Sequence, residues 1–484
     1  MIARIIGSGI AGISTAIRLA NKGYEVHVYE ANSYPGGKLT VVEQKGYRFD
    51  AGPSLFTMPQ YVDELFILSG KNPKDYFSYQ KWPTACHYFF EDGTFLPFSS
   101  DINELCRTIE HVLKVDSKPL RQHFKRSEFI YRKTHVPFLE RSLHKIGNHF
   151  SKETFQAICA IPKLGLFTSM NKLNEAKLNH PKLVQIFNRF ATYNGSNPYQ
   201  APGILHVIPF LEHGYGTFFP NGGMHAITNS LVQLANDLGV QFHFNQQVDE
   251  ILVNHKKVSG IKVNNELLEA DLVVCNADIK PTYTHLLPKS KKPKRILTQE
   301  RSSSAMIFYW GIKKQFPQLD LHNIFFSDNY KAEFDTIFHH NTLSSDPTIY
   351  VHISSKASQS DAPAGCENWF VMINVPSNNG QNWDELRLMA RKLCLTKLSR
   401  ILQTDIESLI ETEDYLDPVL IEQKTSSAGG ALYGTSSNNR MAAFFRHPNF
   451  SSVNGLYFVG GSVHPGGGIP LCLLSAKIVA DLLD

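Results

Sequence analysis

The chain has 484 residues, too many for a single hydrophobic core, so two or more domains are expected. A hydrophobic content of 42% and a charged content of 19% are typical of a soluble globular protein, and a net charge of +4 is too small to indicate a nucleic-acid-binding protein. Seven scattered cysteines without a Cys-x-x-Cys pair indicate buried thiols in a reducing compartment and predict neither disulfides nor a metal site.

Residues 2–30 show the order strand, glycine-rich turn, helix and strand. Gly7 allows a tight turn, Gly9 lets the backbone approach a pyrophosphate, and Gly12 lets the helix pack against the first strand. The free N–H groups at the start of this helix face bound phosphates. Glu30 ends the second strand, where a carboxylate accepts ribose hydroxyls and repels a 2′-phosphate. The stretch predicts binding of FAD or NAD. The alternative is a tight turn that binds nothing.

A glycine pair and a lysine follow the second strand at Gly36, Gly37 and Lys38. Their position just past Glu30 suits a loop that folds back over the phosphates, and Lys38 would add positive charge at the pyrophosphate. The alternative is an ordinary Pro-Gly turn with a solvated lysine.

Residues 47–56 form a predicted strand that runs into a Gly-Pro turn. Here the chain resembles the superfamily of flavin-containing amine oxidases and carotenoid desaturases. The resemblance implies that the segment Ala51–Leu55, with Ser54 and Leu55, passes close to a flavin.

Residues 101–218 are dominated by helical patterns, with helices expected at 102–115, 124–149, 153–161 and 182–193. Basic residues lie among them, and a second basic run occupies 289–295. Both sets are explained either as solvated faces or as surfaces that dock on anionic lipid, with apolar residues of the helical part leading into a tunnel.

The sequence predicts neither a membrane span nor an export signal. The first predicted strand begins at residue 2, which leaves no room for a signal peptide, and no run of about eighteen apolar residues is present. We expect a cytoplasmic protein, with a peripheral position on the inner face of the cell membrane as the further option.

The cofactor domain is expected to resume at residue 219 with a helix to 238 and strands at 240–244, 248–253, 258–263 and 270–276. In the family that this block resembles, Val248 faces the adenine, and the chain near Asn276 lines the adenosine end. Strands at 303–312, 348–354 and 369–375, followed by a helix at 383–402, predict a second sheet.

Residues 455–470 form the second strong signal: a buried strand, a glycine-dense turn and then a helix at 471–483. The N-terminus of this helix, at Gly468 and Ile469, can hydrogen-bond the pyrimidine edge of a flavin and hold negative charge on the reduced ring. Gly461 and Ser462 are placed to meet the pyrophosphate or the ribityl chain. The resemblance also implies that the loop 428–434, with Leu432, folds over the flavin ring.

Both ends of the chain and residues 219–278 resemble the phytoene-desaturase-type carotenoid oxidoreductases. The sequence Gly-Gly-Ser-Val-His-Pro-Gly at 460–466 and Gly-Gly-Met at 222–224 are most similar to the 1-hydroxycarotenoid 3,4-desaturases. The resemblance implies an α/β fold: a Rossmann-like FAD-binding domain (1–100, 219–295 and 425–484) with an inserted α+β substrate domain (101–218 and 296–424). It further implies an FAD-dependent desaturase that forms a C-3,4 double bond in a 1-hydroxylated acyclic or monocyclic carotenoid by hydride transfer to flavin N5.

Three alternatives to that function stay open: a phytoene desaturase that forms lycopene, a flavin oxidase acting on an amine or a porphyrinogen, and a non-enzymatic lipid-binding protein of the same fold. The expected partners are a hydrophobic carotenoid and an external electron acceptor, quinone or oxygen, and no nucleic acid. The catalytic residue stays unassigned: Glu212, His213 and His464 are candidate proton acceptors, but a hydrogen-bonded loop residue is the favoured interpretation of each.

Overall fold

Two sheets divide the chain, and the first is a five-stranded parallel sheet in the order β19, β13, β1, β2 and β9. The structure, a computed structural model, describes residues 1–439 and 442–483. The strands of the first sheet are β1 (Ile2–Ile6), β2 (Glu25–Tyr29), β9 (Gln241–His243), β13 (Leu272–Cys275) and β19 (Leu456–Phe458). This sheet therefore joins strands from both ends of the chain, with β1 at its centre.

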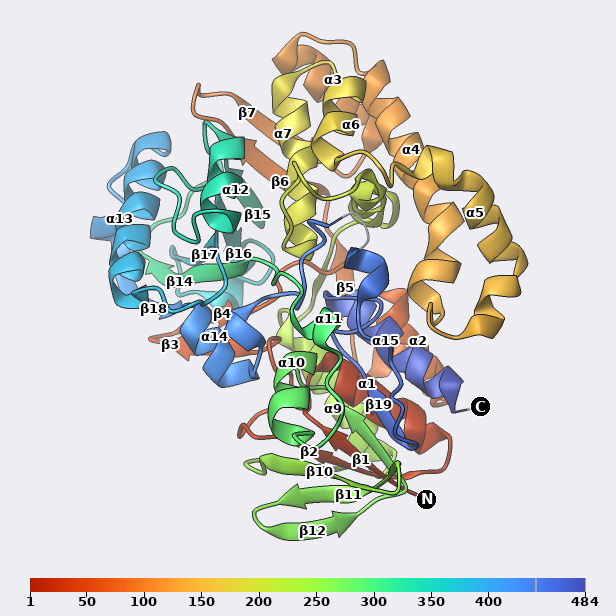
Figure 1. Cartoon of the computed structure of the whole chain (residues 1–484). Coiled ribbons are helices and arrows are strands. Elements are labelled where there is room, and N and C mark those ends of the chain that lie inside the picture. The colour runs from red at the N-terminus through yellow and green to blue at the C-terminus, as the bar shows by residue number, and fades with distance from the viewer. Residues whose placement is uncertain (440–441, 484) are drawn as a thin grey trace.

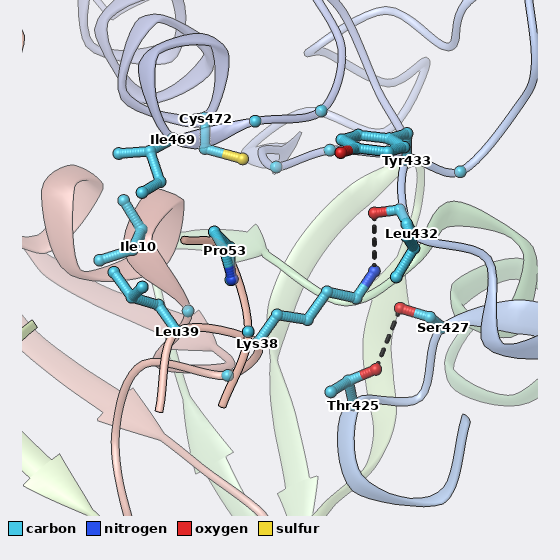
Figure 2. A pocket seen from close by; sticks show the side chains of 18 of the residues that line it. Ile10, Lys38, Leu39, Pro53, Thr425, Ser427, Leu432, Tyr433, Ile469 and Cys472 are labelled. Carbon is cyan, nitrogen blue, oxygen red and sulfur yellow. Dashed lines mark hydrogen bonds between the residues drawn. The ribbon is translucent and has the colours of Figure 1, made fainter. Parts of the chain in front are cut away.

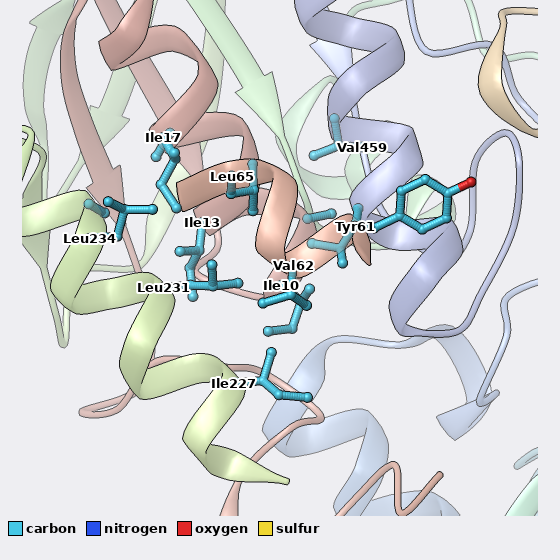
Figure 3. Close-up of a cluster of buried hydrophobic side chains, with 14 of the residues drawn as sticks. Ile10, Ile13, Ile17, Tyr61, Val62, Leu65, Ile227, Leu231, Leu234 and Val459 are labelled. Atoms are coloured by element: carbon cyan, nitrogen blue, oxygen red, sulfur yellow. The ribbon is translucent and has the colours of Figure 1, made fainter. Parts of the chain in front are cut away.

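Four helices pack together on one face of this sheet: α1 (Ile10–Asn21), α2 (Gln60–Leu68), α9 (His225–Asp237) and α15 (Ile469–Leu482). On α1, the apolar residues Ile10, Ile13 and Ile17 recur at the spacing of one helix face and are buried. Figure 3 shows them beside Leu231 of α9 and Val62 of α2. The helix that follows the glycine-rich turn is thus fixed by packing on three other helices.

A smaller antiparallel sheet covers the opposite face with β10 (Val248–Asn254), β11 (Lys257–Val263) and β12 (Glu266–Glu269). Successive side chains of a strand point to opposite faces. Accordingly Ile5 of β1 packs among the helices, whereas Ile6 packs in the cluster that holds Ile251 and Ile261 of the smaller sheet.

The second large sheet has seven strands in the order β18, β14, β17, β16, β15, β6 and β7. Its strands are β6 (Thr84–Phe89), β7 (Phe95–Ser99), β14 (Ser304–Ile312), β15 (His322–Phe325), β16 (Ile349–Ile353), β17 (Glu367–Val375) and β18 (Ile410–Leu416). Helix α13 (Trp383–Ile401) packs on one face, where Trp310 and Trp369 are fully buried. The strands expected at 303–312, 348–354 and 369–375 and the helix expected at 383–402 are confirmed. Helix α12 (Tyr330–Phe338) was not predicted.

The helical part lies next to strands β6 and β7 of the seven-stranded sheet (Figure 1). It contains α3 (Ile102–Leu113), α4 (Lys118–His135), α5 (Lys152–Leu164), α6 (Met170–Lys177), α7 (Pro181–Arg189) and α8 (Val207–Phe210). A single helix at 124–149 is wrong: α4 begins earlier and ends at His135. Pro137 lacks the N–H donor that an α-helix needs, so the chain changes to a wider turn at Val136–Glu140. Within the described residues, none of the helices has both the length and the hydropathy required to span a bilayer.

Shorter elements complete the fold. They are β3 (Val41–Gln44) paired with β4 (Tyr47–Asp50), β5 (Tyr79–Lys81) paired with β8 (Phe218–Pro220), and the short helices α10 (Ile279–Pro281), α11 (Lys294–Leu297) and α14 (Pro418–Thr425). The division into two domains stays a proposal, with one change. We expected residues up to 100 in the cofactor domain, but β6 pairs with β15 and brings β7 with it into the seven-stranded sheet.

Candidate functional site

A cavity of about 1210 Å³ runs between the parallel sheet, the seven-stranded sheet and the helical part. Single small-molecule sites usually measure roughly 300–1,000 Å³, so this cavity has room for more than one molecule. All predicted cofactor residues except Gly12 line it: Gly7, Gly9, Glu30, Gly37, Lys38, Ser54, Leu55, Val248, Asn276, Leu432, Gly461, Ser462, Gly468 and Ile469. The sequence therefore identified residues that the fold gathers around one space, and their contact with FAD stays a prediction.

The glycine-rich turn is shaped by steric limits at its backbone. Gly7 has a φ of +92°, a conformation that favours glycine. A Cβ atom on Gly12 would lie 2.1 Å from the carbonyl oxygen of Gly7, so only glycine lets α1 approach the turn this closely. Gly9, which precedes α1, has no side chain to cap the helix, so the N–H groups of the first turn are left for phosphate oxygens, except that of Gly12, which donates to Asn276.

Asn276 joins the turns from the two ends of the chain. Its Oδ1 accepts a hydrogen bond from the N–H of Gly12 at 3.0 Å, and its Nδ2 donates to the carbonyl oxygen of Val459 at 3.2 Å. Its placement beneath the glycine-rich turn gives this residue a positioning role that the resemblance did not indicate. Val248 is buried nearby, next to Gln246 and Gln247, which also line the cavity.

The Glu30 carboxylate is held in place at the end of β2. Its Oε2 accepts hydrogen bonds from the backbone N–H and the hydroxyl of Ser8, both at 2.8 Å. Its Oε1 accepts from the backbone N–H and the side-chain amide of Asn32, both at 2.9 Å. The sequence had indicated neither partner, and together they fix the carboxylate at the cavity edge where the ribose hydroxyls are expected.

The loop at Gly36, Gly37 and Lys38 folds back over the glycine-rich turn, and its place over the phosphates of a cofactor stays a prediction. The N–H of Gly36 donates to the carbonyl oxygen of Ser8 at 2.9 Å. The Lys38 ammonium donates to the carbonyl oxygens of Ala431 and Leu432 at 2.9 and 3.0 Å (Figure 2). We expected this charge at the pyrophosphate, and its contact with loop 431–432 is a partner that the sequence did not predict.

Burial lowers the pKa of Lys38 from its ordinary value of 10.5 to about 8, against the opposing effect of Asp278. Between these two pKa values the Lys38 amine binds more protons in the unfolded chain than in the folded protein, so the stability of the folded state rises with pH. We expect the free energy of unfolding of flavin-free wild type to rise relative to that of Lys38→Met between pH 8 and pH 10.5. Chemical denaturation at a series of pH values measures this difference. Lys289→Met, at an exposed position, is the control, and parallel pH profiles for wild type and Lys38→Met would contradict the shifted pKa.

The segment 51–55 is pinned between the loop at Lys38 and the second sheet. A Cβ atom on Gly52 would lie 1.7 Å from the carbonyl oxygen of Lys38, which leaves no room for a side chain. The hydroxyl of Tyr309 donates to the carbonyl oxygen of Ala51 at 2.7 Å. The Ser54 hydroxyl and the Tyr350 hydroxyl are hydrogen-bonded at 2.8 Å. The segment thus forms the boundary between the cofactor end of the cavity and the seven-stranded sheet.

The glycine-dense turn near the C-terminus closes the cavity from the other side. Helix α15 follows Gly468, which has a φ of +107°, and no side chain caps its N-terminus. The Ser462 hydroxyl accepts a hydrogen bond from the N–H of Ile279 at 3.0 Å. In Figure 2, Ile469 and Cys472 of α15 lie beside Ile10 of α1. The N-termini of α1 and α15 therefore border the same space.

Arg446 is a buried residue of this wall that the sequence did not indicate. Its guanidinium donates to the carbonyl oxygens of Tyr433, Thr435 and Gly461 at 2.9 to 3.0 Å and to the Asn194 side-chain oxygen at 3.1 Å. Burial, together with the nearby Arg301, lowers the pKa of Arg446 to about 10. This one side chain holds loop 433–435 against the glycine-dense turn.

Of the three candidate proton acceptors, only Glu212 lines the cavity. His464 is hydrogen-bonded through Nε2 to the carbonyl oxygen of Arg141 at 2.9 Å, and burial lowers its pKa to about 4. Burial lowers the pKa of His213 to about 3, with Arg189 adding to the effect. The placement of both histidines favours a structural role.

One part of the cavity lining is mainly apolar. Its residues come from the segment after α4, from positions before, within and just after α8, and from strands of the seven-stranded sheet: Phe138, Leu139, Leu143, Ile204, Val207, Ile208, Leu211, Ile307, Ile324, Phe370 and Met372. Such a surface suits a long hydrocarbon and excludes water. The site thus combines an end lined by the predicted cofactor residues with this apolar part, called the apolar arm below.

Known proteins resemble this chain over nearly its whole length. The model of the family described as flavin containing amine oxidoreductase matches residues 10–483. The chain is 54% identical over 480 residues to a 1-hydroxycarotenoid 3,4-desaturase of Flavobacterium sp. (strain P99-3), covering 99% of this chain and 98% of that one. It is 33% identical to a 4,4'-diapolycopene oxygenase of Methylomonas sp., covering 99% and 97%.

Two solved structures show the same fold. An oxidoreductase from Methanosarcina mazei superposes with a TM-score of 0.65 at 16% identity, covering 99% of this chain and 100% of that one. Putrescine oxidase bound to putrescine superposes with a TM-score of 0.64 at 12% identity, covering 100% and 99%. The predicted fold class, a Rossmann-like cofactor domain combined with an α+β substrate domain, is confirmed.

Proposed function

The chain belongs to the flavin-containing amine oxidoreductases, and we propose that within this family it is an FAD-dependent carotenoid desaturase. Its substrate is a 1-hydroxylated acyclic or monocyclic carotenoid, into which it introduces the C-3,4 double bond. The observation that carries this proposal is the 54% identity, over 99% of the chain, to a 1-hydroxycarotenoid 3,4-desaturase. The apolar arm of the cavity supports it, because a carotenoid is a long hydrocarbon.

The residues around the cavity fit FAD. Only glycine at position 12 lets the N-terminus of α1 lie this close to the turn, and hydrogen bonds hold the Glu30 carboxylate where ribose hydroxyls are expected. The N-terminus of α15, beside Gly468, has no side-chain cap. When bound, the flavin supplies a hydride acceptor at N5. The chain itself orients the polyene in the apolar arm, excludes water from it, and leaves reoxidation to an external acceptor such as quinone or oxygen.

The proposal is tested by supplying the purified protein, FAD and liposomes with one of two substrates. We expect a red shift in the absorption of extracted pigment with a 1-hydroxylated carotenoid that has a saturated 3,4 bond, and none with phytoene. A series of coloured products from phytoene would instead identify a phytoene desaturase. Inactivity of a yellow protein with both would favour amine or porphyrinogen oxidation, and a protein that binds no flavin would favour a lipid carrier.

We further propose that the protein works as a peripheral protein on the inner face of the cell membrane, through the region of α5. Four large apolar side chains are exposed there: Phe150 (86%), Phe155 (67%), Ile158 (55%) and Phe167 (67%). Exposed lysines flank them at 145, 152 and 163. Apolar residues beside basic ones are typical of surfaces that bind anionic lipid.

The inner side of α5 connects this surface to the cavity. Ala160 and Leu164 of α5 are buried in a cluster with Ile130, against which Ile204 and Val207 pack. Both Ile204 and Val207 also line the apolar arm. Buried residues of α5 therefore pack against residues that line the apolar arm, which supports entry of a carotenoid from the bilayer in this region.

Replacing Phe150, Phe155, Ile158 and Phe167 together by serine is expected to weaken binding to liposomes of anionic lipid by at least ~10-fold, because the variant buries less apolar surface in the bilayer. Co-sedimentation with the liposomes measures the change.

The matched control carries Leu388→Ser and Met389→Ser on α13, where the two side chains are 65% and 43% exposed on a different part of the molecule. Its liposome binding is expected to equal that of wild type. Equal losses in both variants would show that binding does not depend on the surface around α5.

A further inference from the structure

A buried charged group interrupts the apolar arm of the cavity. Arg189, at the end of α7, and Glu212, in the turn Leu211–Tyr215 that follows α8, both line the cavity and are only 6% and 2% exposed. Burial of charge costs free energy, and a cavity that held only hydrocarbon would gain nothing from it. The pair therefore points to a polar group on the ligand.

The contacts within this group fix its geometry. The Tyr193 hydroxyl donates to Oε2 of Glu212 at 2.6 Å. Arg189 donates through Nη1 to the Tyr193 hydroxyl and through Nη2 to the Tyr88 hydroxyl, both at 2.8 Å. The guanidinium also lies over the rings of Tyr88, Phe190 and Tyr193, 4.9 to 5.4 Å from their centres. Because Arg189 is held by two hydrogen bonds and three aromatic rings, and Tyr193 in turn holds Glu212, their polar atoms are in place before a ligand enters.

One oxygen of this group lacks a hydrogen bond. Oε1 of Glu212 has no hydrogen-bond partner among the described residues; Nη2 of the Arg189 guanidinium lies 3.8 Å away, and Nε2 of the neutral His213 ring, which also has no hydrogen-bond partner, lies 3.4 Å away. Burial raises the pKa of the Glu212 carboxyl, against the opposing effects of Arg189 and Tyr193. A buried polar atom without a partner is costly unless a ligand supplies one.

We infer that the Glu212 carboxyl, oriented by Tyr193 and Arg189, hydrogen-bonds the tertiary hydroxyl of the carotenoid. This inference rests on the proposed function and assigns the recognition of its hydroxylated substrate to named residues. The apolar arm holds the polyene, and the Glu212 group holds the one polar end that distinguishes this substrate from a hydrocarbon.

The position of the group agrees with the chemistry. The hydroxyl is on C1, only a few bonds from C3 and C4, so its binding site has to lie near the cofactor end of the cavity. Tyr193 is followed by Asn194, whose side-chain oxygen accepts a hydrogen bond from Arg446. Arg446 in turn donates to the carbonyl oxygen of Gly461 in the glycine-dense turn. A short chain of contacts thus connects the hydroxyl-binding group with the wall of the flavin site.

A site built to hydrogen-bond a hydroxyl discriminates strongly against an analogue without it, because its own polar atoms are then left unpaired. The test compares a 1-hydroxylated carotenoid with the analogue that lacks the hydroxyl, using FAD-loaded protein in liposomes. Two properties are measured for each substrate: kcat/KM, and the amount of pigment that stays with the protein through gel filtration.

The double variant Arg189→Met/Glu212→Met replaces the pair by apolar residues of similar size, a change that proteins often tolerate. We expect the preference in kcat/KM for the hydroxylated substrate to fall by at least ~100-fold, with retention of the unhydroxylated pigment equal to or above that of wild type. Glu212→Gln, which keeps the size of the side chain, is expected to lose a smaller part of the preference.

The matched control is Glu333→Gln, since Glu333 is a buried carboxyl on α12 that is hydrogen-bonded to Ser327 and Thr348 and does not line the cavity. It is expected to leave the preference unchanged. An equal loss of kcat/KM for both substrates in the double variant, with unchanged preference, would overturn the inference. Failure of the proposed function is distinguishable, because wild type itself would then convert neither carotenoid.

Discussion

Gly12→Ala is expected to give a folded protein that no longer retains FAD. The added methyl group would lie 2.1 Å from the carbonyl oxygen of Gly7 and 3.0 Å from Oδ1 of Asn276, so the N-terminus of α1 has to move away from the turn. Overpacking of this kind costs roughly 3 kcal/mol. If this cost falls on the FAD-bound state alone, the Kd for FAD rises about 100-fold. The ratio of flavin to protein absorbance after gel filtration, with titration of the flavin-free protein, measures the effect.

The matched control for this substitution is Gly147→Ala. A Cβ atom there would meet nothing within 4 Å, and the backbone is not in the left-handed region. FAD binding by this variant is expected to equal that of wild type. An unchanged Kd in Gly12→Ala would show that the phosphates do not bind at this turn.

Arg446→Met is expected to lower the free energy of unfolding by roughly 3–4 kcal/mol. The guanidinium donates to three carbonyl oxygens and one side-chain oxygen, and methionine leaves these acceptors without a donor in a buried place. Because those acceptors belong to loop 433–435, Asn194 and the glycine-dense turn, the wall of the cofactor site should loosen as well. Urea denaturation gives the free energy from the midpoint and slope.

Arg132→Met provides the comparison, since this arginine is 72% exposed and forms an ion pair with Glu128 on the same helix. Its free energy of unfolding is expected to stay within ~0.5 kcal/mol of wild type. If Arg446→Met unfolds at the same urea concentration as Arg132→Met, the four hydrogen bonds contribute no net stability.

The sequence predicted those parts of the site that depend on local backbone chemistry. Glycines at Gly7, Gly9 and Gly12, and the glycine-dense turn before α15, are placed by turns and close approaches that only a few residues of chain determine. The same local logic predicted the strands of the parallel sheet and, in the seven-stranded sheet, β14, β16 and β17, because periodicity and β-branched or aromatic content lie within a short window.

Contacts between distant residues could not be predicted in this way. Ser54 and Tyr350 are 296 positions apart, and β6 pairs with β15, whose residues follow it by more than two hundred positions. β6 was not among the predicted strands, and even where a pattern marks a strand it does not specify the neighbour of that strand. Arg446 follows an apolar run at 441–445, and that unusual setting for a charge was the one available signal of its burial.

The parallel sheet joins strands from both ends of the chain, and this determines when the cofactor site can form during synthesis. Its neighbours β2 and β13 leave the ribosome early and midway, but β19, Arg446 and the N-terminus of α15 leave it near the end. Domains generally fold as units as they emerge. The nascent chain therefore has to keep an incomplete nucleotide-binding sheet from aggregating until residues 456–472 are available, and stable retention of FAD begins only after that point.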